Sequence, residues 1–154
     1  MKIKIREANV KDLKDVANLQ MKLLKYERKF DNKIKVGTTT SNTKYLKYNM
    51  LKKNKGKIFI ALDENRIIGY CDGWIEKITH YTFNKRGYVI DCFVLKKYRG
   101  ESVGSRLLKE LIKWFKSKNV KYVIIDVYSK NKKAYKLWKN LGFKEIIINM
   151  RRVV

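Results

Sequence analysis

The chain has 154 residues, 45% of them hydrophobic, which indicates one globular domain over residues 1–154 with a single core. The N-terminus does not resemble a signal peptide, no apolar run is long enough to span a bilayer, and two widely spaced cysteines form no metal-binding motif, so the cytoplasm is the expected compartment. The net charge of +24 fits a lysine-rich solvated surface, which we favour, or a polyanion site.

Hydrophobic periodicity predicts that the first third of the chain contains one strand and two helices. Alternating residues over 2–7 are typical of a strand, and an apolar stripe over 10–30 predicts a helix that Asn9 can cap. The polar stretch 31–42 is expected to be a loop, and a shorter helix follows Thr43. The rest of the chain alternates between strand and helix periods. The expected elements are strands at 57–62, 67–79 and 86–95, a helix at 103–118, a strand at 122–128, a helix at 131–141 and a strand at 143–150.

The segment from Tyr88 to Leu108 joins an apolar strand to a helix through a basic turn that carries glycine. The turn reads Arg-Gly-Glu-Ser-Val-Gly over 99–104. The first N–H groups of a helix have no intrahelical acceptor, and the helix dipole favours anions there, so such a turn can hold phosphate oxygens. Packing of the helix against the strand would explain the glycines equally well.

A second block, NKKAYKLWKNLGF over 131–143, follows the turn after a helix and a strand. Together the two blocks resemble the signature motifs of the GNAT superfamily of N-acetyltransferases, Arg/Gln-x-x-Gly-x-Gly/Ala and Asn-x-x-Ala-x-x-x-Tyr-x-x-x-Gly-Phe. The resemblance covers nearly the whole chain and implies an α/β fold with a mixed, splayed central sheet flanked by helices in the order βααβββαβαβ. It also implies that acetyl-CoA is the cosubstrate and that no metal is needed. Since such proteins often form dimers, a homodimer is possible.

The resemblance implies a role for each motif residue in holding the cofactor. The end of the central strand would bind the pantetheine arm, with the Val94 amide as the oxyanion donor, and the turn would hold the pyrophosphate. Ser102 replaces the usual Gly, which is costly if its φ is positive. The expected cofactor-binding residues are Phe93, Val94, Arg99, Gly100, Glu101, Ser102, Val103, Gly104, Asn131 and Trp138.

The acid and base of the reaction are less directly indicated. Trp138 stands where the family usually has a Tyr that protonates the leaving thiolate, and an indole N–H cannot act as that acid. Tyr135 lies nearly on the same helical face and is our candidate substitute, the alternatives being solvent protonation and a purely structural Tyr135. Asp91 is the first candidate for the base, ahead of Asp72 and Glu76 on the neighbouring strand.

The leading hypothesis is an enzyme that transfers the acetyl group of acetyl-CoA to a primary amine. The acceptor is either a small cationic amine, such as a polyamine or an aminoglycoside, or a protein amine. A non-catalytic acyl-CoA-binding or sensing module is the alternative, and the sequence holds no recognised nucleic-acid motif. A cationic acceptor needs acidic neighbours; the candidates are Glu27, Asp31, Asp72, Glu76 and Asp91.

Overall fold

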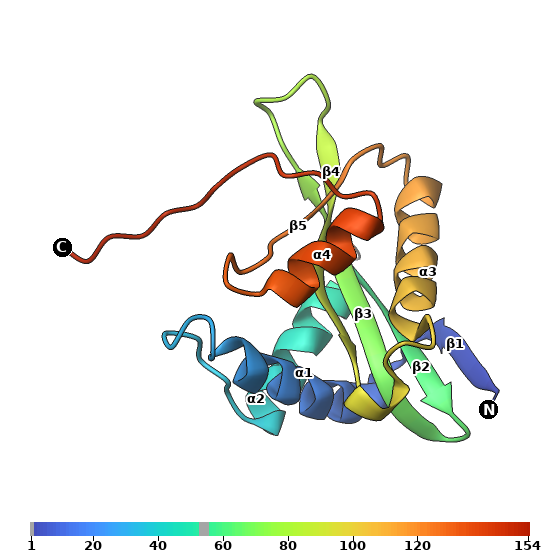
Figure 1. Cartoon of the computed structure of the whole chain (residues 1–154). Helices are drawn as coiled ribbons and strands as arrows, with labels where there is room; N and C mark the ends of the chain where they lie inside the picture. Colours follow the sequence, from blue (N-terminus) through green and yellow to red (C-terminus); the bar gives the residue numbers. More distant parts are fainter. Residues whose placement is uncertain (1, 53–55) are drawn as a thin grey trace.

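The computed structural model describes residues 2–52 and 56–154, which form one mixed sheet with helices on both faces (Figure 1). The strands lie in the order β1-β2-β3-β4-β5, and neighbouring strands are antiparallel except β4 and β5, which are parallel. None of the described helices is both long enough and apolar enough to cross a membrane. In chain order the elements are β1 (Ile3–Glu7), the 3-10 helix η1 (Val10–Asp12), α1 (Leu13–Glu27), α2 (Thr39–Lys47), the π-helix η2 (Tyr48–Lys52), β2 (Gly56–Asp63), β3 (Arg66–Lys77), β4 (Lys85–Val94), the 3-10 helix η3 (Lys96–Tyr98), α3 (Val103–Ser117), β5 (Val123–Ile125) and α4 (Lys132–Asn140).

Two clusters of buried side chains fix the layers on either side of the sheet. One lies between the sheet and α3 and includes Leu107, Leu111 and Phe115, each fully buried, together with Trp138 from α4. The other lies between the sheet and α1 with α2 and includes Leu13 and Leu46. Burial of these apolar side chains is the main favourable term that holds the helices on the sheet.

Strand β4 contains a bulge that separates the two faces of the site. Asp91 pairs with Asp72 of β3, whereas the next pair along is Val89 with Gly73, so Ile90 has no partner. An extra residue of this kind breaks the simple alternation of side chains. Val89 therefore packs in the cluster beneath α3, while Asp91 turns to the other face, where it bonds a side chain of α1.

The N-terminal helices begin and end at different residues from those expected. The helix predicted over 10–30 is divided into η1, capped by Asn9, and α1, which ends at Glu27. The stretch 31–42, expected to be a loop throughout, contains the start of α2. Thr38 and Ser41 form a capping box there, in which each side chain accepts from the other residue's backbone amide, and this pairing starts the helix earlier than predicted.

The predicted final strand over 143–150 is wrong, because no strand follows α4 in the described chain. Its isoleucines remain exposed, with Ile148 at 75% exposure, and the segment extends away from the sheet (Figure 1). Arg151 instead forms two hydrogen bonds, at 3.0 and 2.9 Å, to the carboxylate of Asp31. The strand expected over 122–128 is shorter than predicted, since β5 pairs only with residues 87–89 of β4.

Candidate functional site

The turn before α3 presents backbone amides that no side chain among the described residues caps. Ser102 occupies the N-cap position of α3, but its side chain makes no capping hydrogen bond, whereas Thr38 caps α2 and Asn131 caps α4. Gly100 has a φ of 89°, and a Cβ at that position would meet no atom within 4 Å. The open, uncapped N-terminus of α3 is thus suited to bind an anion.

The turn and the end of β4 are connected by the side chain of Arg99. Its Nε donates to the Val94 carbonyl at 2.8 Å, and its guanidinium lies 5.5 Å from the centre of the Phe93 ring. Gly104, in the first turn of α3, lies against the same strand end, where a Cβ would meet Val94 Cγ2 at 3.8 Å. The predicted cofactor residues of β4 and of the turn therefore lie together.

The outer edge of β4 is open beyond the bulge, because β5 pairs only with residues 87–89. The Leu95 amide donates to the Ile68 carbonyl of β3 at 2.9 Å. Since successive amides of an antiparallel strand point to opposite edges, the Val94 amide faces the edge that none of the described strands covers at this point. That amide is available to a carbonyl oxygen placed beside the strand.

Helix α4 places its motif residues in three different environments. Asn131 is buried, and its Oδ1 accepts the Ala134 amide at 3.2 Å, so its side chain caps α4. Trp138 is 8% exposed and packs edge to face against Phe143. Tyr135 is exposed, and its hydroxyl donates to Glu145 at 3.3 Å. The negative charge of Glu145 raises the pKa of the Tyr135 phenol, which keeps it protonated.

Two carboxylates face each other on the opposite side of β4, where α1 crosses the sheet. Asp72 and Asp91 are cross-strand partners, and the Asp91 amide donates to Asp72 Oδ1 at 3.1 Å. Burial raises the pKa of both carboxyls, and the Asp91 charge raises that of Asp72 further. Gln20 Nε2 and the Tyr70 hydroxyl each donate to Asp91 Oδ2 at 3.0 Å, which opposes the shift at Asp91.

Of the other three candidate acidic residues, one has no charged partner and two are paired with arginines. Glu27, the last residue of α1, forms no side-chain hydrogen bond or ion pair with the described residues, and burial and the Asp91 charge raise its pKa to about 7. Asp31 is held by Arg151, and Glu76 by Arg86 at 2.7 Å. Glu27 thus joins Asp72 and Asp91 as the acidic group of this face.

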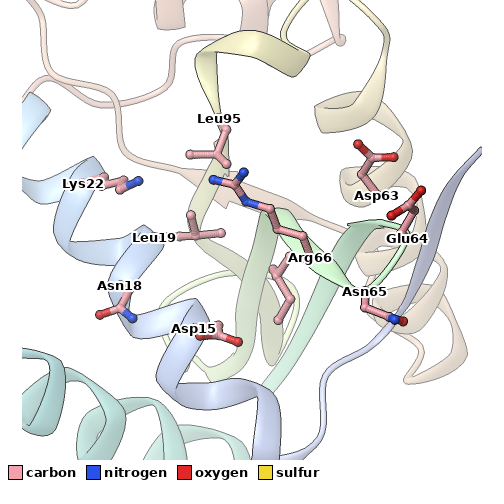
Figure 2. Close-up of a pocket in the computed structure, with 10 residues that line it drawn as sticks. Asp15, Asn18, Leu19, Lys22, Asp63, Glu64, Asn65, Arg66 and Leu95 are labelled. Atoms are coloured by element: carbon pink, nitrogen blue, oxygen red, sulfur yellow. The ribbon is translucent and has the colours of Figure 1, made fainter. Parts of the chain in front are cut away.

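A shallow cavity of about 590 Å³ lies away from these residues, between α1, the β2–β3 turn and Leu95 (Figure 2). Its charged lining combines acidic and basic side chains, including Asp15, Glu64, Lys22 and Arg66. None of the predicted cofactor or acceptor residues lines it. Elsewhere, the described residues contain no group of three or more His, Cys, Asp or Glu side chains arranged to hold a metal ion.

Gln20 and Tyr70 belong to the site but were not expected from the sequence. Gln20 stands in the apolar stripe of α1, between Val16 and Leu23, and is 5% exposed. A polar residue at a buried helix position signals a buried partner, so this signal was present in the sequence. Tyr70 lies in an apolar strand, where a tyrosine is unremarkable.

Comparison with known proteins gives one consistent family. The family model described as "Acetyltransferase (GNAT) family" matches residues 23–143. An N-alpha-acetyltransferase of Sulfurisphaera tokodaii is 32% identical over 102 residues, which cover 62% of this chain and 61% of that protein. The chain spans about half to three fifths of the length of the curated relatives it matches.

Solved structures share the fold over almost the whole chain. A tetramutant of the BH1408 protein from Bacillus halodurans superposes with a TM-score of 0.85 at 23% identity, over 98% of this chain and 99% of that one. A predicted acetyltransferase from Clostridium acetobutylicum, crystallised with acetyl-CoA, gives a TM-score of 0.77 at 19% identity, over 99% of this chain and 96% of that one. At these identities the likeness concerns the fold alone.

Proposed function

The chain belongs to the GNAT family of acetyltransferases, and we propose that it is an enzyme that transfers the acetyl group of acetyl-CoA to a primary amine. The observation that carries the proposal is the position of the uncapped N-terminus of α3 beside the open edge of β4. An anion-binding turn next to a strand edge with free amides suits a molecule that combines a pyrophosphate with an amide-containing arm.

In the proposed complex the amides of the turn from Arg99 to Gly104, including those of Glu101 and Val103, bind the pyrophosphate of acetyl-CoA. Phe93 and Val94 bind the pantetheine arm along the open edge of β4. Asn131 and Trp138 contact the same arm from the side of α4. The lysine-rich surface attracts the anionic cosubstrate and raises its encounter rate at low salt.

In the reaction the amine nitrogen bonds to the acetyl carbonyl carbon, the carbon–sulfur bond breaks, and the thiolate takes a proton. The Val94 amide would stabilise the oxyanion, since it faces the uncovered edge of β4. Asp91 would take the proton from the amine, directly or through water. Tyr135 is the proposed acid, supported by its place one helical turn before the buried Trp138.

The acceptor is proposed to be cationic before it loses its proton. Glu27, Asp72 and Asp91 concentrate acidic groups at one place in a chain whose net charge is +24. Such a site attracts an ammonium group and disfavours an anionic acceptor. The S. tokodaii relative is named for transfer to an α-amine, so peptide N-termini stand beside polyamines and aminoglycosides as candidate acceptors.

The test is transfer of radiolabelled acetyl from acetyl-CoA across polyamines, aminoglycosides, amino acids and basic peptides. A labelled product establishes the enzyme and its acceptor class. Label is followed because the thiols of Cys71 and Cys92 would add background to an assay for released thiol. Binding of acetyl-CoA without transfer to any amine would favour the alternative, a non-catalytic acyl-CoA-binding module.

A further inference from the structure

The carboxylate of Asp91 is held asymmetrically, with its two oxygens in different surroundings. Oδ2 accepts two hydrogen bonds, one from Gln20 Nε2 and one from the Tyr70 hydroxyl, each at 3.0 Å. Oδ1 accepts none from the described residues, and the residue as a whole is only partly buried. One oxygen is therefore held by two donors, and the other has no hydrogen-bond donor among the described residues.

Both donors to Oδ2 come from rigid, buried positions. Gln20 lies in the middle of α1 and is 5% exposed, while Tyr70 lies in β3 and is fully buried. A side chain packed this tightly has few alternative rotamers, so each donor direction is fixed. The Asp91 amide is also engaged, by Asp72 Oδ1 at 3.1 Å. The carboxylate is thereby restrained from α1 through Gln20 and from β3 through Tyr70.

We propose that Gln20 and Tyr70 are positioning residues that turn Asp91 Oδ1 toward the acceptor amine and keep the carboxylate ionised. This inference rests on the proposed function, because it concerns the base of the same reaction. Two donors to one carboxylate oxygen stabilise the charged form and oppose the effect of burial. A base held in a fixed direction loses little entropy when the amine arrives.

Several titratable groups lie close enough to Asp91 for its negative charge to raise their pKa values. Besides Tyr70, they are Glu27 of α1, Tyr45 of α2, and Cys71 and Asp72 of β3. None of these groups carries a positive charge. Among the described residues, the two hydrogen bonds from Gln20 and Tyr70 are therefore the main interactions that favour the carboxylate form.

The experiment is the pH profile of kcat/KM for Tyr70→Phe and Gln20→Met, measured at saturating acetyl-CoA. Each variant removes one donor to Oδ2, so we expect the acidic limb of the profile to move to higher pH by about one unit. The affinity for acetyl-CoA should stay unchanged. Tyr98→Phe is the matched control, because it removes a buried tyrosine hydroxyl that donates to another carboxylate, Asp63, at 2.7 Å.

A second readout does not depend on activity. The pKa of the Asp91 carboxyl is measured by carbon-13 NMR of labelled aspartates, with Asp91→Asn to assign the signal. It should rise in Tyr70→Phe and in Gln20→Met and stay constant in Tyr98→Phe. An Asp91 pKa that does not move in either folded variant overturns the positioning role.

The pH profile and the NMR titration also distinguish a failure of the proposed function from a failure of the positioning role. A wild-type protein that transfers no acetyl group overturns the proposed function, and NMR still decides whether Gln20 and Tyr70 hold Asp91. If the enzyme is active and Glu27→Gln loses the acidic limb of the kcat/KM profile, the base is Glu27, and the role of Asp91 as the base is refuted. Under the proposal the limb persists in Glu27→Gln and moves to lower pH, since a negative neighbour has been removed.

Discussion

Asp72 and Asp91 are directly opposed on β3 and β4, and the amide of Asp91 donates to the carboxylate of Asp72. Burial and the Asp91 charge hold the pKa of Asp72 well above its usual range, whereas the Asp91 carboxylate receives two hydrogen bonds that counteract its burial. Two carboxyl groups this close do not both ionise readily, because their negative charges repel. The proton of the pair is therefore assigned to Asp72 and the charge to Asp91.

This division gives different expectations for two isosteric changes. Asp72→Asn should keep turnover within a few-fold, because an amide oxygen can accept the Asp91 amide as a protonated carboxyl does. Asp91→Asn should lower kcat by about a hundredfold or more, the usual effect of losing a general base. Both are measured as acetyl transfer at saturating amine. Equal losses in the two variants would contradict the assignment.

Glu27 should make folding stability depend on pH. Its pKa rises from an ordinary value of 4.5 to about 7 in the folded protein, chiefly through burial and secondly through Asp91. Below 4.5 the side chain is protonated in both states, so Glu27→Gln and the wild type should be equally stable. As pH rises from 4.5 to about 7 the unfolded state ionises first, and the wild type loses stability relative to the variant. Thermal unfolding of both proteins across this range measures the effect, and a constant difference would refute it.

Ser102 stores backbone strain at the N-terminus of α3. Its φ of 58° lies in the left-handed region, where a Cβ is unfavourable. Ser102→Gly should therefore stabilise the protein by about 1 kcal/mol in denaturant unfolding. Affinity for acetyl-CoA should be unchanged, since the amide remains. A gain in affinity that Ser102→Ala shares would show instead that the hydroxyl hinders the ligand, because both variants lack it.

Gly104 tests the anion site with a matched pair of variants. Gly104→Glu places a carboxylate at the first turn of α3 and should weaken acetyl-CoA binding by at least about tenfold. Gly104→Ala is the control, because a Cβ there makes only ordinary contacts at 3.8 and 4.0 Å with Val94 and Cys92. Calorimetry measures both. Equal affinity in the two variants would remove the phosphate-binding role of the turn.

Tyr135→Phe tests the proposed acid. Turnover should fall by about a hundredfold while the affinity for acetyl-CoA is kept, if the phenol protonates the thiolate. Glu145→Gln is a useful companion, since it removes the hydrogen bond to the hydroxyl and the charge that raises its pKa. Near-normal turnover of Tyr135→Phe would leave solvent as the proton source.

The sequence was most informative where a local pattern determines local structure. The apolar stripe of α1, the cap at Asn9, the turn at 99–104 and the helix after it follow from spacing and residue type, and all are present. The predicted strand over 143–150 failed because its alternation requires a partner edge, and none of the described strands pairs with it. Pairing between distant segments is set by the whole fold rather than by local propensity.

The acceptor side was predicted only in part, for the same reason. The sequence predicts Asp91 as the first candidate for the base, and its bond to Gln20 places it on the α1 face of the sheet, where Phe93 also packs. The contact itself joins residues 71 positions apart and depends on how α1 crosses the sheet. The pairing of Asp31 with Arg151 spans a still greater separation. Composition and spacing carry no information about such contacts.

The unpaired Ile90 has a consequence for the comparison of this chain with its relatives. What matters at this position is the count of residues, since one extra residue in β4 places Val89 under α3 and Asp91 beside α1. Deleting Ile90 would restore plain alternation and force one of these side chains onto the wrong face. An alignment that puts a one-residue gap elsewhere in β4 would therefore equate Asp91 with a residue of the opposite layer, although every other position could look well matched.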